Sequence, residues 1–190
     1  MLPVARVVVA GRDARPRWRR RFGRSSVDRV AGSTDASVLV VERLPIPVYQ
    51  RPLVATSLDD DAARMMSLAV ELCDPAAVDL VLVHTLRVPF HATHPLFRAA
   101  CLEREIEAAA LDAMREVVHA AGLACDVELV TRHGDPGDVL LSELGNRRCD
   151  LAVVGAHDPA TIPRLLRGSI AARVLAASPC DVLVIGRRRP

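Results

Sequence analysis

The chain has 190 residues, enough for one α/β core with additional elements, and 51% of them are hydrophobic while only 3% are aromatic. Its core must therefore be built from aliphatic side chains, which suits helices packed on a parallel sheet. A formal net charge of +2 argues against a strongly charged partner such as nucleic acid.

The cysteines and the apolar segments bear on the location of the protein. No CxxC pair occurs among Cys73, Cys101, Cys125, Cys149 and Cys180. An odd, unclustered set is typical of reduced, buried thiols. Arg6 and Arg12 interrupt the first apolar run, so we expect no signal peptide, and no run is long enough for a transmembrane helix. We therefore expect a cytoplasmic protein without membrane contact.

Residues 1–44 are predicted to hold a strand, a helix and a second strand. An apolar run at 7–11 is followed by an arginine-rich loop, a helix that begins near Ser25 and an apolar run at 38–41. Because the net charge is small, we interpret the arginine-rich loop as solvated rather than as a nucleic-acid contact. Residues 45–52 are rich in proline and are predicted to be an extended linker.

Residues 53–190 are predicted to form a complete domain in which strands alternate with helices. Strands are expected at 53–56, 80–84, 126–130, 151–154 and 182–185, and the alternation at 126–130 is expected of a strand at the sheet edge. Asp59-Asp60-Asp61 is expected to cap the first helix, and a long helix is expected at 95–121. Asp135-Pro136, with proline in the first turn, and Gly168-Ser169 are expected to open the last two helices. This order predicts a doubly wound parallel sheet with right-handed crossovers. Ligands of such sheets bind at the carboxyl ends of the strands, where the winding direction changes.

The two parts of the chain are related by an internal repeat. A shift of 144 positions, without a gap, places one segment on the other: Gly11 on Gly155, Ser25 on Ser169, Arg29-Val30 on Arg173-Val174 and residues 38–40 on residues 182–184. We interpret residues 1–44 as the C-terminal half of a second copy of the domain. Its strands are expected either to extend the sheet of the full domain or to complete a dimer, because an apolar sheet edge would otherwise stay open.

The segment after the strand at 151–154 has features of a phosphate site. Gly155 ends that strand, and Gly168-Ser169 opens the next helix. Glycine lets a ligand approach the backbone closely, and the free N–H groups of a helix start favour an anion.

Four residues of this segment resemble the hallmark motif of the universal stress protein family. The motif is a glycine, two residues, a glycine, nine residues, and a glycine followed by serine or threonine, and its positions here are Gly155, Asp158, Gly168 and Ser169. The resemblance spans residues 53–186, with a partial second match over 6–41. It implies a Rossmann-like three-layer α/β sandwich with a five-stranded sheet in the order 3-2-1-4-5, here with an extra N-terminal βαβ half-repeat. It also implies a homodimer formed through the last strand.

The resemblance further implies a site for ATP or another adenine nucleotide, with Mg²⁺ accompanying ATP. Carried onto this chain, the site consists of Thr56, Ser57, Thr85, Val154, Gly155, His157, Asp158, Gly168, Ser169 and Ile170. Some members of the family bind ATP and others do not.

Two of these residues depart from the family pattern. Ser57 replaces an acidic residue at the end of the first strand, and Asp158 replaces the second glycine. Like unit charges about 4 Å apart repel by roughly 1 kcal/mol in water and about 4 kcal/mol at an effective dielectric constant of 20. Asp158 therefore disfavours a phosphate nearby, unless Arg164, Arg167 or a bridging Mg²⁺ offsets the repulsion.

Three hypotheses for the function stay open. The first is a non-catalytic stress-response protein that binds an adenine nucleotide. The second is a nucleotide-free dimeric interaction module with a decayed site. The third and weakest is slow Mg²⁺-dependent ATP hydrolysis with Asp158 holding the metal.

No catalytic constellation supports an enzyme. The sequence contains no Ser-His-Asp arrangement, pair of carboxylates or P-loop that predicts catalysis. His91 and His94 lack a cysteine or an acid at metal-binding spacing, so we expect no metal site of the protein's own.

Overall fold

The computed structural model describes residues 7–11, 36–42, 48–59, 61–86, 96–156 and 170–186. Its strands are β1 (Val7–Gly11), β2 (Ser37–Val41), β3 (Pro52–Thr56), β4 (Leu80–Leu86), β5 (Val127–His133), β6 (Leu151–Gly155) and β7 (Asp181–Ile185). Its helices are α3 (Ala62–Glu71), α4 (Leu96–Ala121), α5 (Pro136–Asn146) and α6 (Ile170–Ala177). The helix expected near Ser25 lies outside the described residues.

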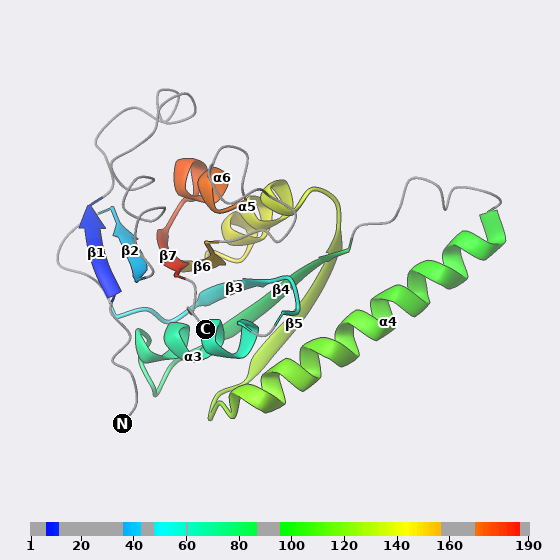
Figure 1. Cartoon of the computed structure of the whole chain (residues 1–190), viewed down its shortest axis with the longest axis horizontal. Coiled ribbons are helices and arrows are strands. Elements are labelled where there is room, and N and C mark those ends of the chain that lie inside the picture. Colours follow the sequence, from blue (N-terminus) through cyan, green and yellow to red (C-terminus); the bar gives the residue numbers. More distant parts are fainter. Residues whose placement is uncertain are drawn as a thin grey trace.

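All seven strands form one sheet in the order β1-β2-β7-β6-β3-β4-β5 (Figure 1). Counted from β3, the five strands of the predicted full domain follow the order 3-2-1-4-5, and their neighbouring pairs are all parallel. The strands β1 and β2 extend this five-stranded sheet, and the pair between β2 and β7 is antiparallel. Exposure alternates along the edge strand β5 only over Val127, Glu128 and Leu129, because the next two residues are both buried.

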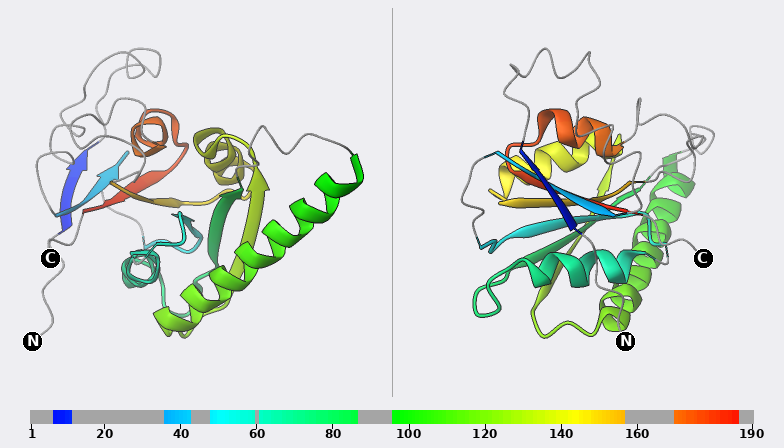
Figure 2. Two further views of the ribbon diagram at one scale, coloured as in Figure 1. Left: turned by 45° about the vertical axis from the view of Figure 1, so that its right-hand side comes forward. Right: turned by 60° about the vertical axis from the view of Figure 1, so that its left-hand side comes forward.

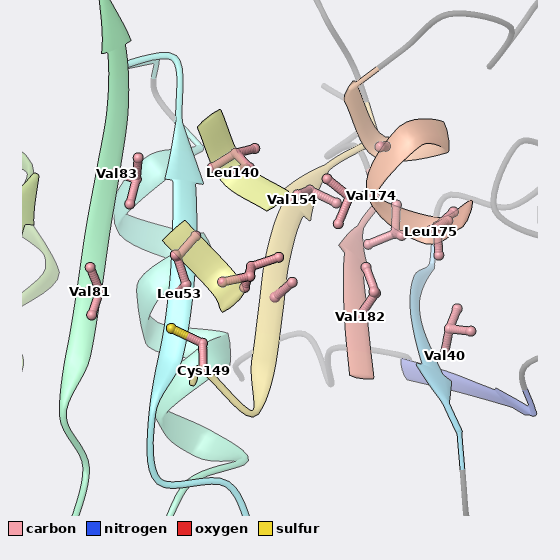
Figure 3. Close-up of a cluster of buried hydrophobic side chains, with 14 of the residues drawn as sticks. Val40, Leu53, Val81, Val83, Leu140, Cys149, Val154, Val174, Leu175 and Val182 are labelled. Atoms are coloured by element: carbon pink, nitrogen blue, oxygen red, sulfur yellow. The ribbon is translucent and has the colours of Figure 1, made fainter. Parts of the chain in front are cut away.

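Helices cover both faces of the sheet (Figure 2). α5 and α6 lie on one face, and α3 and α4 lie on the other. Alternate residues of each strand point to opposite faces, so Val81 and Val83 belong to the same core cluster as Leu140 of α5 and Val174 of α6 (Figure 3). Leu80 and Leu82 instead belong to the core that contains the methionines of α3 and α4: Met65, Met66 and Met114. This layered arrangement agrees with the predicted α/β sandwich.

The starts of α3 and α5 differ in how they are capped. Asp135 caps α5 as the sequence predicts, because its carboxylate accepts hydrogen bonds from the backbone N–H groups of Gly137 and Asp138, and Pro136 occupies the first turn. The expectation that the aspartates at 59–61 cap α3 is wrong for Asp61, whose side chain makes no capping hydrogen bond. The Asp59 carboxylate instead accepts from the N–H of Asp61 and belongs to the turn before the helix.

The N-terminal strands extend the sheet of the same chain. β1 pairs parallel with β2, and β2 pairs antiparallel with β7 (Figure 1). This is one of the two arrangements that the sequence left open. It also corrects the surface expected for a homodimer: the edge of β7 is already paired with β2, so it is not open to a second chain in this structure.

Candidate functional site

The candidate site lies at the carboxyl ends of β3 and β6, where the sheet changes its winding direction. β3 and β6 are parallel neighbours. From β3 the chain proceeds to β4 and β5 on one side, and from β6 it proceeds to β7 on the other. A doubly wound sheet is open to ligands at such a point, because the connections leave its two halves in opposite directions.

The end of β3 forms a tight polar turn. The hydroxyl of Thr56 accepts a hydrogen bond from the backbone N–H of Leu58 at 2.8 Å, and Leu58 has a left-handed backbone with φ of 62°. The hydroxyl of Ser57 donates to the Asp59 carboxylate at 2.5 Å. Ser57 and Asp59 are both exposed. A carboxylate is therefore present beside position 57, although it is carried two residues further along the chain.

His84 links the end of β4 to this turn. Its Nδ1 lies 2.9 Å from the carbonyl oxygen of Thr56. A carbonyl oxygen only accepts hydrogen bonds, so Nδ1 carries the hydrogen and Nε2 of the neutral ring keeps its lone pair. This contact fixes the ring of His84 against the end of β3.

The ends of β6 and β7 are joined just beyond the strands. Gly155 ends β6 and pairs with Ile185 of β7, and the N–H of Ala156 donates to the carbonyl oxygen of Ile185 at 3.0 Å. α6 starts at Ile170, and Ile170, Ala55 and Ala156 each pack against the core on the α5 and α6 side. The end of β6, the end of β3 and the first turn of α6 are thus held together by one apolar cluster.

A charged clamp fixes α6 against the start of α5. The Arg173 guanidinium of α6 forms ion pairs with Asp135 and Asp138. Partial burial raises the pKa of the Asp135 carboxyl, but backbone hydrogen bonds from Asp138 and Gly137 and the Arg173 charge outweigh this effect and lower the pKa below its ordinary value. Gly137 makes room for the clamp, since a Cβ added there would lie 2.8 Å from Cζ of Arg173.

The structure brings some of the predicted site residues together. Thr56 and Ser57 lie at the end of β3, Val154 and Gly155 at the end of β6, and Ile170 at the first turn of α6. Thr85 is half-buried near the end of β4, where it pairs with Arg132 of β5, one strand further from β6. The remaining predicted residues lie outside the described part of the chain: His157, Asp158, Gly168 and Ser169.

Sequence reasoning missed two contributions to this region. Asp59 was treated only as a helix cap, although its spacing from Ser57 allows a local side-chain hydrogen bond. The contact between His84 and Thr56 could not be predicted from the sequence, because these residues come together only when β3 and β4 pair in parallel register.

Within the described residues, no group of three or more His, Cys, Asp or Glu side chains could hold a metal ion. Burial raises the pKa of the Cys73 and Cys149 thiols to about 12, so both stay protonated at neutral pH and serve as apolar core atoms.

The helices in the described part of the chain include none that is long and apolar enough to cross a membrane.

Comparisons with known proteins agree with this architecture. Residues 49–186 match the model of the universal stress protein family. A Thermus aquaticus protein named universal stress protein in QAH/OAS sulfhydrylase 3'region is 27% identical over 139 residues, which cover 73% of this chain and 99% of that protein.

Two crystal structures extend the comparison. A universal stress protein in complex with cAMP is 25% identical, with a TM-score of 0.51 over 74% of this chain and 98% of its own. A universal stress protein from Archaeoglobus fulgidus shares the fold at 19% identity and a TM-score of 0.67, over 95% of this chain and 60% of its own. The match over residues 49–186, together with the sheet order and the related proteins, shows that the chain belongs to the universal stress protein family.

Proposed function

We propose that this chain is a non-catalytic stress-response protein that binds an adenine nucleotide, such as ATP with Mg²⁺, at the carboxyl ends of β3 and β6. The observation that carries the proposal is the winding switch between β3 and β6, with α6 following the hallmark segment at 155–169. A family member with 25% identity over 98% of its length was crystallised with cAMP, an adenine nucleotide.

The groups at the end of β3 and β4 suit a nucleoside. Carboxylate oxygens of Asp59 and the Nε2 lone pair of His84 can accept hydrogen bonds from ribose hydroxyls or an adenine amino group, while the Ser57 hydroxyl is held by Asp59. The helix start after Gly168-Ser169 supplies backbone N–H groups for phosphate. The protein's part in this function is to bind and orient, and we assign no residue a catalytic role.

Asp158 is the residue that opposes phosphate binding. Its carboxylate stands at a position where the family motif has glycine. If the charge lies near the phosphates, Asp158→Gly raises the affinity for ATP in the presence of EDTA by tenfold or more, because each 1.4 kcal/mol of relieved repulsion is a factor of ten. If the carboxylate instead holds Mg²⁺ against phosphate, the same variant loses affinity only when Mg²⁺ is present.

Calorimetric titration with ATP and Mg²⁺ tests the proposal, with Gly168→Arg as the blocking variant. The native chain is expected to bind ATP at micromolar concentration, and Gly168→Arg is expected to abolish the binding because a long side chain fills the helix start. Gly145→Arg is the matched control: Gly145 is exposed in α5, and a Cβ added there meets no atom within 4 Å. No heat with the native chain, or equal binding by both variants, contradicts the proposal and favours a nucleotide-free interaction module.

A further inference from the structure

The two ends of the sheet, β5 and β1, differ in chemistry (Figure 1). β5 carries three exposed polar side chains, those of Glu128, Arg132 and His133. β1 has the sequence Val-Val-Val-Ala-Gly, without a charged, polar or proline residue. Charged side chains on an edge strand disfavour pairing with another chain, and β1 carries none. Among the described strands, β1 is thus the end of the sheet whose chemistry favours the addition of a further strand.

β1 is exposed on both of its faces. Val8 is 40% exposed and Val9 is 50% exposed. Successive residues of a strand point to opposite faces of the sheet, so each face of β1 presents an exposed apolar side chain. A strand that is apolar on both faces is typical of the interior of a parallel sheet. The composition of β1 therefore suits a strand with a neighbour on each side.

The 144-residue shift identifies which strand would lie on the outer side of β1. β1 pairs parallel with β2 from Val7–Ser37 to Gly11–Val41, and each of these pairs becomes a pair of the β6–β7 ladder when 144 is added to both numbers. β1 is thus equivalent to β6 in register. β6 has a second neighbour, β3, which pairs with it in parallel on the side away from β7.

Exposure at equivalent positions of β6 and β1 shows the effect of that second neighbour. The two residues of β6 that pair with the centre of β3, Ala152 and Val153, are 1% and 0% exposed. Their equivalents in β1 are Val8 and Val9, which are 40% and 50% exposed. A strand placed beside β1 as β3 lies beside β6 would cover the outer sides of both valines.

We propose that the edge of β1 is a docking surface for an extended apolar segment of a different polypeptide, which pairs with β1 in parallel as β3 pairs with β6. Subtracting 144 from the β6 positions of that ladder gives the register, in which Val8 faces the partner's equivalent of Leu53 and Val9 that of Val54. Main-chain hydrogen bonds supply the affinity of such strand addition, and alternate side chains supply its specificity. The partner segment is therefore aliphatic at these two positions.

A second copy of this chain does not offer its own β3 for this pairing. In the folded chain β3 is already paired on both sides, with β6 and with β4. The segment equivalent to β3 would therefore come from a polypeptide of another kind. The proposal concerns the end of the sheet away from β3 and is independent of nucleotide binding.

A synthetic peptide with the sequence of residues 50–58, which contains β3 and two residues on each side, is the probe. Fluorescence anisotropy of the labelled peptide is expected to show saturable binding to the native full chain at micromolar concentration. Val9→Asp should weaken the binding by about tenfold or more, because the incoming strand would bury a carboxylate without a partner. The variant is expected to fold, since the side chain of Val9 is half exposed.

Leu102→Asp is the matched control for this experiment. It makes an equal change at a side chain of α4 that is 43% exposed, and it should bind the peptide as the native chain does. No binding at millimolar peptide, or equal binding by the native chain and Val9→Asp, overturns the proposal.

Sedimentation equilibrium tests whether a second copy occupies the edge instead. The native full chain and Val9→Asp are expected to have the same mass. A native mass that exceeds that of Val9→Asp would place a second copy of the chain on β1 and would overturn the proposal.

The direction of the added strand is tested by paramagnetic relaxation in NMR spectra of the full chain. A nitroxide at the N-terminus of the peptide should broaden the amide signal of Val7 more than that of Gly11, and a nitroxide at the C-terminus should do the reverse. This gradient follows from the parallel register, in which residue 52 of the peptide faces Val7 and residue 56 faces Gly11. The opposite gradient, or equal broadening at both ends, contradicts the proposed pairing.

Discussion

Asp59 supplies the carboxylate that the family pattern places at position 57, where this chain has serine. The resemblance predicts that a carboxylate is lost at the end of β3, because serine stands where the family has an acid. In the structure the Ser57 hydroxyl donates to Asp59 at 2.5 Å, and the turn through Leu58 brings that carboxylate back to the strand end. The sequence alone does not predict this contact between Ser57 and Asp59, because the contact depends on the left-handed backbone of Leu58.

Asp59→Asn is expected to weaken the binding of ATP by roughly tenfold to a hundredfold, because a hydrogen bond to a charged acceptor contributes about 1.5–3 kcal/mol. Calorimetry against the native chain measures the change. Asp112→Asn, at an exposed carboxylate on α4, is the control and should bind ATP as the native chain does. An unchanged affinity in Asp59→Asn would remove Asp59 from the proposed site.

The structural role of Tyr49 could not be predicted from the sequence. It falls within the predicted linker at 45–52, yet it is 1% exposed, and its hydroxyl donates to the Asp181 carboxylate at 2.7 Å. Burial and the hydrogen bond to Asp181 raise its pKa well above the ordinary range. A proline-rich composition predicts an extended backbone but not what the extended segment packs against.

Tyr49→Phe should lower the free energy of unfolding by about 1.5–3 kcal/mol, because it leaves one oxygen of the buried Asp181 carboxylate without its hydrogen-bond donor. Urea denaturation at neutral pH measures the effect. Gln50→Ala changes the adjacent exposed side chain and should alter stability by less than about 0.5 kcal/mol. Equal stability of all three chains would mean that the tyrosine hydroxyl contributes nothing.

At the scale of elements, the sequence signals that predict helices and buried strands reliably are those carried by neighbouring residues. The Asp135-Pro136 start of α5 and the apolar strands β4, β6 and β7 follow directly from capping chemistry and from runs of aliphatic residues. The contacts between elements could not be predicted from the sequence, because they join residues that lie far apart along the chain. Glu143 of α5 illustrates this: it is buried between Arg132 of β5 and Arg147 at the end of its own helix.

The ion pairs of Glu143 predict a dependence of stability on acid pH. Burial raises the pKa of this carboxyl, but the hydrogen bonds and charges of Arg147 and Arg132 outweigh it and lower the pKa below the ordinary 4.5. The folded chain therefore holds this proton less tightly than the unfolded chain. The stabilisation is complete above pH 4.5 and is lost as the pH falls through the lowered value.

Glu143→Gln should consequently be less stable than the native chain by about 1–3 kcal/mol at pH 7, and the difference should shrink as the pH falls below 4.5. Urea denaturation at several pH values measures this difference. Asp112→Asn, which breaks an exposed pair with Arg115 on α4, should show a much smaller difference at every pH. A Glu143→Gln difference that stays constant down to pH 3 would rule out the linkage.

At the scale of the whole molecule, the sequence predicts an internal repeat but not where its two copies would meet. The shift of 144 residues relates β1 and β2 to β6 and β7, yet a sequence shift does not say whether equivalent strands meet within one chain or between two. The β2–β7 register answers this for the folded chain, because Leu39 and Leu183 meet at the centre of an antiparallel pair. The result is a sheet whose five-stranded domain is extended by two strands of the same chain.

The winding switch between β3 and β6 remains the feature on which the proposed function depends. The most direct measurement is to denature the purified full chain, identify any released nucleotide by chromatography, and titrate the nucleotide-free chain with ATP and Mg²⁺. We expect an adenine nucleotide to be released, and ATP to bind with micromolar affinity in the titration. Neither released nucleotide nor heat on titration would contradict the account, and the chain would then be an interaction module that acts without a nucleotide.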